Sequence, residues 1–434
     1  MYAAAVYLFF LAVLGYAVGF FAGLGVPKGI DQGPHAAVPV AVATDPLLLL
    51  MFAVRLTCAG RPQPSGCGRP DPPTSRRFPL NTEMNTELIE QNVHRLLGAM
   101  TGAATTAMVA IGDQLGLYRA LAGGGPATPD ELAARTGTAA RYLREWLSQQ
   151  AAAGFLAYRQ SDERYGLSAE AAAVLAQEAS PAFLAGGATM TRGWFAGIAR
   201  LAEACRTGAG IPWHEQDPAV FEGTERFFRP GYTASLTTQW VPALPGVADK
   251  LVTGGRVADV GCGHGAAAIL LARAYPQASV HGYDFHDRSI QVARQRADQA
   301  GLGGRIQFEP LDATSYPADG FDLICLLDTL HDLGDPAAAL AHARKALTSD
   351  GAVLVVEPNA ADDYAANLAS PLAALSYAAS TFQCTPAARA QPGGVALGAQ
   401  AGPATVRQLA DDAGFSQFRQ VTQTPVNVVL ELRP

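Results

Sequence analysis

Hydrophobic and polar positions divide the chain into stretches of different pattern, and the first stretch is almost wholly apolar. Residues 1–27 contain no charged side chain and are rich in Ala, Leu, Phe and Val. As a helix they are long enough to cross a hydrocarbon core of about 30 Å. A second apolar stretch, Ala36–Val54, contains Asp45, and a central carboxylate makes its insertion marginal. We expect membrane-spanning segments within 1–58 and a linker over 59–83.

Arginines follow the second apolar stretch, at positions 55, 61, 69, 76 and 77. By the positive-inside rule, a two-span hairpin leaves the remainder of the chain cytoplasmic and tethered to a membrane. A cleaved signal peptide is less favoured because no Lys or Arg precedes the apolar core. A start at Met84, which makes the preceding segment a fusion remnant or an artefact, is left open.

A helical pattern begins at Glu87 and opens a module that we place at 84–180. Its apolar residues recur near helical spacing as far as Leu121. Thr128 and Glu131 form a capping box that predicts the start of a further helix. A helix-turn-helix is predicted at 132–136 and 139–153, and a two-stranded wing at 155–159 and 164–167. The module is therefore expected to be a winged helix, followed by a helical connector over 181–245.

Winged helices often bind DNA, but the charge of this one favours another role. Residues 87–180 hold seven Arg and no Lys against ten Asp and Glu, a balance of −3. Phosphate contact needs the opposite sign. The whole chain has a net charge of −7, which fits a small neutral or cationic ligand better than nucleic acid. We expect the module to dimerise the chain or cover a substrate, with a DNA-binding regulator as the alternative.

The chemistry-bearing region begins where an apolar strand ends in a glycine-rich turn. Residues 256–265 read RVADVGCGHG, and a helix is predicted directly after them. Glycines at 261, 263 and 265 let the backbone bend sharply and approach a ligand. A dinucleotide site satisfies the same spacing, because Gly261, Gly263 and Ala266 match G-x-G-x-x-A. The turn alone leaves the two kinds of site open.

Three acidic residues at successive strand ends favour a cationic cofactor, S-adenosylmethionine. Asp259 precedes the turn, where a carboxylate repels pyrophosphate but attracts a sulfonium. Asp284 ends the second strand and is placed to accept bonds from ribose hydroxyls, and Asp312 follows the third and can accept the adenine amine. The complete set of expected cofactor-binding residues is Asp259, Gly261, Cys262, Gly263, Gly265, Asp284, Phe285, Asp312, Ala313 and Asp328.

Two further strands, at 321–327 and 352–356, and a closing hairpin at 418–424 and 427–432 complete a doubly wound α/β pattern over 246–434. Residues 84–434 resemble a bacterial family of winged-helix class I methyltransferases. The motifs that carry this resemblance are WHEQ, FFRPGY, ADVGCGHG, LLDTLHDLGDP, VVEP, LGAQAG and the LELRP ending. The resemblance implies a seven-stranded Rossmann-like sheet. Separately, Tyr7–Pro34 resembles the opening of the membrane methanethiol S-methyltransferase family, which leaves a membrane thiol methyltransferase as a rival interpretation.

Small-molecule O-methyltransferases have a general-base histidine in a His-Asp pair similar to that at His331, in DTLHDLGDP. Glu357 ends the strand expected beside it and can orient the imidazole. We therefore expect methylation of a small-molecule acceptor, at oxygen, with His331 and Glu357 as the catalytic pair. A structural role for His331 is the alternative, and no second catalytic carboxylate is recognisable between Tyr364 and Thr405.

The acceptor pocket is expected to be aromatic, which suits a flat or hydrophobic molecule. Its predicted residues are Trp213, Phe227, Tyr232, Tyr377 and Phe382. Cys384 lies near them, but a single cysteine in an apolar stretch is usually inert. The six cysteines are widely separated, so we expect neither a metal centre nor a disulfide framework. Analogy with O-methyltransferases predicts a homodimer formed through the winged-helix module.

Overall fold

The computed structural model describes residues 84–434. The membrane-spanning segments predicted within 1–58, and the linker predicted at 59–83, lie outside the described residues.

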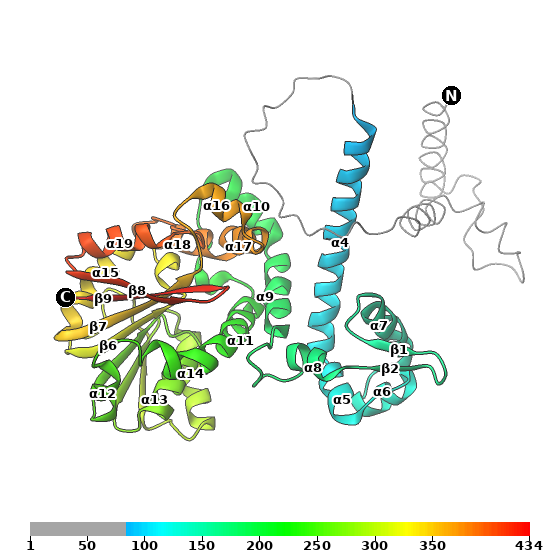
Figure 1. Cartoon of the computed structure of the whole chain (residues 1–434), viewed down its shortest axis with the longest axis horizontal. Helices are drawn as coiled ribbons and strands as arrows, with labels where there is room; N and C mark the ends of the chain where they lie inside the picture. The colour runs from blue at the N-terminus through cyan, green and yellow to red at the C-terminus, as the bar shows by residue number, and fades with distance from the viewer. Residues whose placement is uncertain (1–83) are drawn as a thin grey trace, which may run out of the picture. The chain divides into compact units, whose positions relative to one another are not determined.

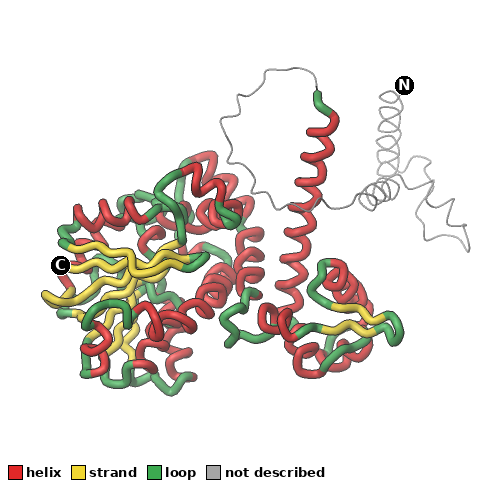
Figure 2. The backbone as a smooth tube through the Cα atoms, in the orientation of Figure 1, coloured by secondary structure: helices red, strands yellow, loops and turns green. Residues whose placement is uncertain are grey.

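The first described part is helical and carries a short two-stranded wing, as the sequence predicts (Figures 1 and 2). Its elements are α4 (Thr86–Gln114), α5 (Leu117–Gly124), α6 (Pro129–Thr136), α7 (Ala140–Ala152), β1 (Ala157–Arg159), β2 (Arg164–Gly166) and α8 (Ala169–Leu175). The Asn85 side chain caps α4, and the predicted capping box of Thr128 and Glu131 begins α6. Tyr118 packs edge-on against Trp146 in the core of this part.

The two ends of helix α4 differ in burial. Its last turns are buried at Val109 and Ala110, whereas the apolar residues of its first half are exposed. Leu96 is 63% exposed and Met100 60% exposed. Among the described residues, α4 is the one helix that is both long enough and apolar enough to cross a membrane. Helices of this length and composition also occur in proteins that do not span membranes. The predicted helical spacing is confirmed, but much of its apolar face has no partner among the described residues.

A helical connector leads from this part to the sheet. It comprises α9 (Ala185–Ala196), α10 (Ile198–Thr207), η1 (Trp213–Glu215), α11 (Pro218–Ser235), η2 (Leu236–Trp240) and α12 (Val247–Val252). Helices α9 and α11 pack closely at Gly223. A Cβ at this position would lie only 2.2 Å from the Met190 backbone nitrogen. Arg226 of α11 donates to Asp113 of α4 at 2.6 and 2.9 Å and to Glu178 at 2.8 Å. This buried ion pair joins the connector to the helical part.

The rest of the described chain is built around a seven-stranded sheet, which confirms the predicted fold class (Figure 2). Its strands are β3 (Arg256–Val260), β4 (Ser279–Tyr283), β5 (Ile306–Glu309), β6 (Phe321–Leu327), β7 (Leu347–Pro358), β8 (Gln417–Gln423) and β9 (Asn427–Arg433). The order is β5-β4-β3-β6-β7-β9-β8; β9 runs antiparallel to both its neighbours, and the other pairs are parallel. The carboxyl ends of β3, β4, β6 and β7 therefore meet at one edge.

Helices cover both faces of this sheet. They are α13 (Ala266–Ala274) and α14 (Asp287–Gln299) on one face and α15 (Pro336–Ala346) and α19 (Pro403–Asp412) on the other. The remaining short elements are η3 (Leu330–Asp332), α16 (Tyr364–Ala369), α17 (Ala373–Ala379), η4 (Ser380–Cys384) and α18 (Thr385–Arg389). Successive strand residues point to opposite layers: Val257 joins the core under α13 and α14, and Ala258 joins the core under α15 and α19. Burial on both faces explains why these strands read as continuous apolar runs.

Candidate active site

The glycine-rich turn after β3 needs glycine for two different reasons. Gly261 has a φ of 74°, and a Cβ there would meet Thr329 Cγ2 at 2.3 Å. Gly265 has a φ of 77°, and a Cβ there would meet Phe308 Cζ at 2.9 Å. Both positions thus combine the left-handed conformation with close packing. At Gly263, by contrast, no atom lies within 4 Å of the place that a Cβ would occupy, so this side of the residue faces open space.

That open space is a cavity of about 420 Å³ at the carboxyl edge of the sheet. Five carboxylate residues line it: Glu225, Asp259, Asp284, Asp328 and Asp332. Among the described residues no Lys or Arg lines it. Its other walls are largely aromatic and aliphatic, with Trp194, Trp213, Phe221, Phe227, Phe228 and Tyr232 among them. The volume suits a ligand site, and the lining favours a cation next to a flat apolar group.

Burial controls the protonation of the carboxylates at the strand ends. Desolvation raises the pKa of Asp259 to about 7, although its carboxylate accepts a hydrogen bond from the Ala268 amide at 3.0 Å. Desolvation likewise raises the pKa of Asp284 to about 6, against hydrogen bonds from the His286 amide at 2.8 Å and the Gly263 amide at 2.9 Å. A cation in the cavity favours the ionised form of both groups.

Asp328, at the end of β6, is held by two other elements. Tyr232 of α11 donates its hydroxyl to one carboxylate oxygen at 2.7 Å, and Asn427 of β9 donates its amide to the other at 2.8 Å. Burial raises the pKa of Asp328 to about 7. Its φ of 49° places a non-glycine residue in the left-handed region. The two hydrogen bonds therefore fix the carboxylate at the cavity wall, and the backbone of this residue is strained.

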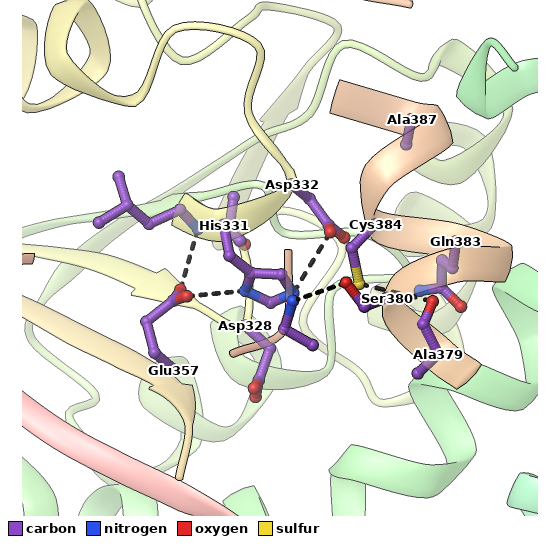
Figure 3. Close-up of polar contacts among 12 residues, drawn as sticks. Asp328, His331, Asp332, Glu357, Ala379, Ser380, Gln383, Cys384 and Ala387 are labelled. Atoms are coloured by element: carbon purple, nitrogen blue, oxygen red, sulfur yellow. Dashed lines mark hydrogen bonds and ion pairs between the residues drawn. The ribbon is translucent and has the colours of Figure 1, made fainter. Parts of the chain in front are cut away.

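His331, in η3, lies between acidic groups (Figure 3). Its Nδ1 is 2.7 Å from Glu357 Oε2, and the other oxygen of Glu357 accepts the Leu330 amide at 3.1 Å. On the opposite side, Nε2 is 3.3 Å from Asp332 Oδ1, with Cys384 beyond. Burial lowers the pKa of His331, but the carboxylates of Glu357 and Asp332 outweigh it and leave the pKa well above its ordinary value. The pair predicted at the ends of β6 and β7 is thus in hydrogen-bond contact.

Most of the predicted site residues line this one cavity. They are Asp259, Gly261, Cys262, Gly263, Asp284, Phe285, Ala313, Asp328, His331, Trp213, Phe227 and Tyr232. Glu357 lies behind His331, and Gly265 packs against Phe308. Asp312 is exposed, and its carboxylate accepts from the Thr314 amide at 2.7 Å, so it lies outside the lining although neighbouring Leu311 and Ala313 belong to it.

The structure does not bring two of the predicted acceptor residues to the cavity wall. Phe382 is stacked on Trp194 with ring centroids 5.7 Å apart, and Tyr377 packs beside Tyr364. The wall near them is formed instead by Leu375, Ser376 and other residues of the same segment. Glu225, Trp194 and Asp332 were not predicted as site residues. A sequence signal existed for Asp332 alone, because it directly follows His331.

Sheet order, glycine turn and acidic strand ends together define a class I methyltransferase, the class whose members use S-adenosylmethionine. Comparison with protein families agrees. Residues 251–404 match the family described as "Methyltransferase domain", and residues 103–177 match the "Rv2258c-like winged HTH domain". The chain therefore joins a class I S-adenosylmethionine-dependent methyltransferase domain to an N-terminal winged helix, and the predicted class is confirmed.

Individual proteins match the chain over limited lengths. The chain is 30% identical over 141 residues to 27-O-demethylrifamycin SV methyltransferase of Amycolatopsis mediterranei, covering 32% of this chain and 46% of that protein. It is 46% identical over 55 residues to methanethiol S-methyltransferase of Pseudomonas sp. (strain GM41(2012)), covering 13% of this chain and 21% of that protein. The match thus spans less than half of either relative.

A solved structure extends the likeness in fold. Human N-acetylserotonin methyltransferase in complex with SAM superposes with a TM-score of 0.58 at 20% identity, covering 82% of this chain and 99% of that one. The fold of that protein therefore extends over both described parts of the chain.

Proposed function

We propose that this protein transfers the methyl group of S-adenosylmethionine to an oxygen of a small, flat, hydrophobic acceptor, with His331 as general base. The observation that carries the proposal is the buried His331–Glu357 pair, 2.7 Å apart, on the wall of a cavity that also contains the glycine turn and its carboxylates. A small-molecule acceptor is also supported by two similar proteins, a 27-O-demethylrifamycin SV methyltransferase and an N-acetylserotonin methyltransferase.

The residues present fit the cofactor on two counts. Gly263 leaves its backbone open to the cavity, and the carboxylates of Asp259 and Asp284 lie beside it with no Lys or Arg in the described lining. Those residues would hold the cationic donor, together with Phe285 and Ala313. When bound, the donor supplies an activated methyl group on sulfur. Alignment of the acceptor and exclusion of water then remain for the protein to provide.

Proton removal from the acceptor hydroxyl is assigned to Nε2 of His331. With the Nδ1 proton donated to Glu357, the lone pair of the ring lies on Nε2. Glu357 keeps the ring in this tautomer and stabilises the imidazolium that forms once the proton is taken. The Leu330 amide holds the other oxygen of Glu357, which fixes the carboxylate itself.

The acceptor end of the cavity selects by shape and polarity. Trp194, Trp213, Phe227 and Phe228 line the cavity, and aromatic walls favour stacking of a flat molecule. Five carboxylate residues and, among the described residues, no Lys or Arg line this space, so an anionic acceptor is disfavoured by charge. The proposal is therefore a neutral aromatic or polycyclic hydroxyl compound.

We also propose that the protein acts as a homodimer joined through α4. The apolar residues exposed on its first half include Leu88, Ile89, Val93, Leu96, Leu97 and Met100. They repeat at helical spacing, which a second copy of the same helix can cover. The local balance of −3 in residues 87–180 does not favour nucleic acid as the partner.

The decisive experiment identifies the acceptor. Purified full-length protein is incubated with methyl-labelled S-adenosylmethionine and a small-molecule extract, and mass spectrometry identifies which compound gains one methyl group. The proposal expects an aromatic hydroxyl compound with wild-type protein and none with His331→Ala. Tight calorimetric binding of a nicotinamide dinucleotide, with none of S-adenosylmethionine or its demethylated product, would overturn it.

A further inference from the structure

Three metal-ligating side chains converge at the acceptor end of the cavity. His331 and Asp332 come from η3, and Cys384 comes from the end of η4, a segment far away in sequence. The imidazole nitrogen, a carboxylate oxygen and the thiol sulfur all lie within 4.8 Å of one another. Figure 3 shows them on the side of the His331 ring opposite Glu357. All three residues line the cavity.

Hydrogen bonding within the protein accounts for only part of this arrangement, in which the Cys384 thiol interacts with both His331 and Asp332. Oδ1 of Asp332 is buried and has no hydrogen-bond partner, although it lies 3.3 Å from Nε2 of His331. The contact of the Cys384 thiol with the Ala379 carbonyl is long, at 3.8 Å. A separation of roughly 3.3 Å is what two ligands about 2.0–2.1 Å from one tetrahedral zinc ion would show. The free carboxylate oxygen is thus placed as a ligand would be.

The surroundings of His331 also match a metal ligand. Histidines bound to metals usually donate their other ring N–H to a carboxylate, which fixes the tautomer and the ring. Glu357 is in that position at 2.7 Å from Nδ1. The charge of the cavity points the same way, because five carboxylate residues line it and no Lys or Arg does so among the described residues. The cationic donor, bound near Asp259 and Asp284, would offset the negative charge of those two residues. A dication at the acceptor end would offset the negative charge of Asp332.

We propose that Nε2 of His331, the Asp332 carboxylate and Sγ of Cys384 form a site for Zn²⁺ or a similar divalent transition metal. A nitrogen, a sulfur and an oxygen ligand suit zinc, and three protein ligands leave a fourth position open toward the cavity. Binding replaces the proton of the Cys384 thiol, which passes to solvent, by the metal.

The metal and the proposed general base use the same lone pair. Nε2 of His331 cannot bind a metal and accept the proton of an acceptor hydroxyl at once. On the proposed function, the metal-loaded protein therefore lacks its base, and Zn²⁺ inhibits methyl transfer until a chelator removes it. This consequence rests on the proposed function, whereas metal binding itself does not.

Cobalt spectroscopy tests the site without donor or acceptor. Tag-free, metal-stripped full-length protein is titrated with Co²⁺, and wild-type protein is expected to show a thiolate-to-cobalt charge-transfer band and the visible bands of tetrahedral cobalt. Cys384→Ser is expected to lose the charge-transfer band, while Cys205→Ser, which changes an exposed cysteine, retains it. Glu357→Gln is expected to weaken Co²⁺ affinity about 10- to 100-fold by removing the carboxylate behind the histidine.

The absence of the band in wild-type protein, or an unchanged band in Cys384→Ser, overturns the site. If circular dichroism shows that Cys384→Ser does not fold, wild-type protein provides the test: Zn²⁺ must slow alkylation of Cys384 and leave that of Cys205 unchanged, and equal rates overturn the site. The two proposals fail separately, because protein that methylates an acceptor without binding cobalt overturns the metal site alone. Protein that binds cobalt at Cys384 but methylates nothing overturns the function alone.

Discussion

Nε2 of His331 is the atom on which methyl transfer depends in the proposed function. His331→Ala removes it, and we expect kcat at pH 7 to fall about 100- to 10,000-fold, the usual contribution of a general base. S-adenosylmethionine affinity should change little, because the donor is held by residues at the ends of β3 and β4. Turnover of the identified acceptor and calorimetry of donor binding measure the two effects.

The matched control is His94→Ala, which removes an exposed histidine on α4 and should leave both quantities unchanged. A His331→Ala protein with wild-type kcat would show that the base assignment is wrong.

Glu357 acts through His331, so its replacement should shift a pH profile as well as lower a rate. The Glu357 carboxylate raises the pKa of His331. A general base must be unprotonated, so kcat rises with pH through that pKa. Glu357→Gln lowers the histidine pKa and moves this rise to lower pH, while kcat on the plateau falls because the imidazolium loses its counter-charge. The kcat–pH profiles of the two proteins give the comparison.

Glu357→Asp should restore part of the plateau rate, because it returns the charge at a slightly greater distance. A lower rate in Glu357→Gln with no movement of the profile would indicate a purely structural role.

The strand-end carboxylates predict a pH-dependent donor affinity. The pKa values of Asp259, Asp284 and Asp328 are raised to about 7, 6 and 7. Above these values the carboxylates are already ionised, whereas below them a cationic ligand must displace protons. Affinity for S-adenosylmethionine should therefore fall between pH 8 and pH 5.5, by up to about tenfold per pH unit for each carboxylate that loses its proton. Calorimetry at several pH values measures this.

S-adenosylhomocysteine, which lacks the sulfonium charge, should show a smaller fall. Asp259→Asn should flatten the dependence, and Asp319→Asn, at an exposed carboxylate that pairs with Arg256, should leave it intact. Parallel pH curves for the two ligands would contradict an electrostatic role for the strand ends.

Among the elements, α4 makes the clearest prediction about assembly. Leu96 is 63% exposed on an apolar face, so Leu96→Glu places a charge where a second copy would pack. We expect the wild-type protein to sediment as a dimer and this variant as a monomer, because burying an unpaired carboxylate is costly. Analytical ultracentrifugation distinguishes the two states.

Gln91→Glu adds the same charge to α4 at an exposed polar position on the opposite side of the helix from Leu96 and should leave the dimer intact. Wild-type protein that sediments as a monomer at all concentrations would exclude this interface.

Elements with strong local signals were predictable from the sequence. The glycine turn, the acidic strand ends and the capping box of α6 depend on neighbouring residues, and each lies where the pattern puts it. Phe382 was not predictable, because η4 is a π-helical turn over Ser380–Cys384. Such a turn adds a residue and rotates the following side chains by about 100° relative to an α-helix.

Long-range contacts and local competition account for the remaining differences. Asn427 reaches Asp328 only because β9 lies next to β7, a pairing that no short segment encodes. Asp312 was expected to face the adenine, but its carboxylate accepts hydrogen bonds from the amide and hydroxyl of Thr314. Short polar side chains often bond the backbone of their own loop in this way.

At the scale of the whole described unit, Arg226 links the winged helix to the connector that covers the cavity. Its guanidinium pairs with Asp113 at 2.6 Å in a buried position. Arg226→Met would leave the buried carboxylate with only its 3.5 Å contact to the half-exposed Arg119, so we expect the free energy of unfolding to fall by about 3 kcal/mol. Denaturant unfolding followed by circular dichroism measures the loss.

Adding Asp113→Asn should recover much of this stability, since the poorly compensated buried charge is then gone. Arg141→Met, which breaks an exposed pair with Glu145, should cost less than about 1 kcal/mol. A similar small loss in Arg226→Met would mean that the buried pair does not hold the parts together.

The left-handed backbone of Asp328 has a consequence for protein engineering. A non-glycine residue in that conformation costs about 1–3 kcal/mol, and Asp328 stays there while holding Tyr232 and Asn427. Glycine at this position would remove the strain but also a carboxylate that lines the cavity and accepts hydrogen bonds from Tyr232 and Asn427, each worth about 1–3 kcal/mol when a buried donor is left without its partner. The gain and the loss are of similar size, so stability alone does not preserve this carboxylate. In searches for heat-resistant variants, selection for activity must accompany selection for stability.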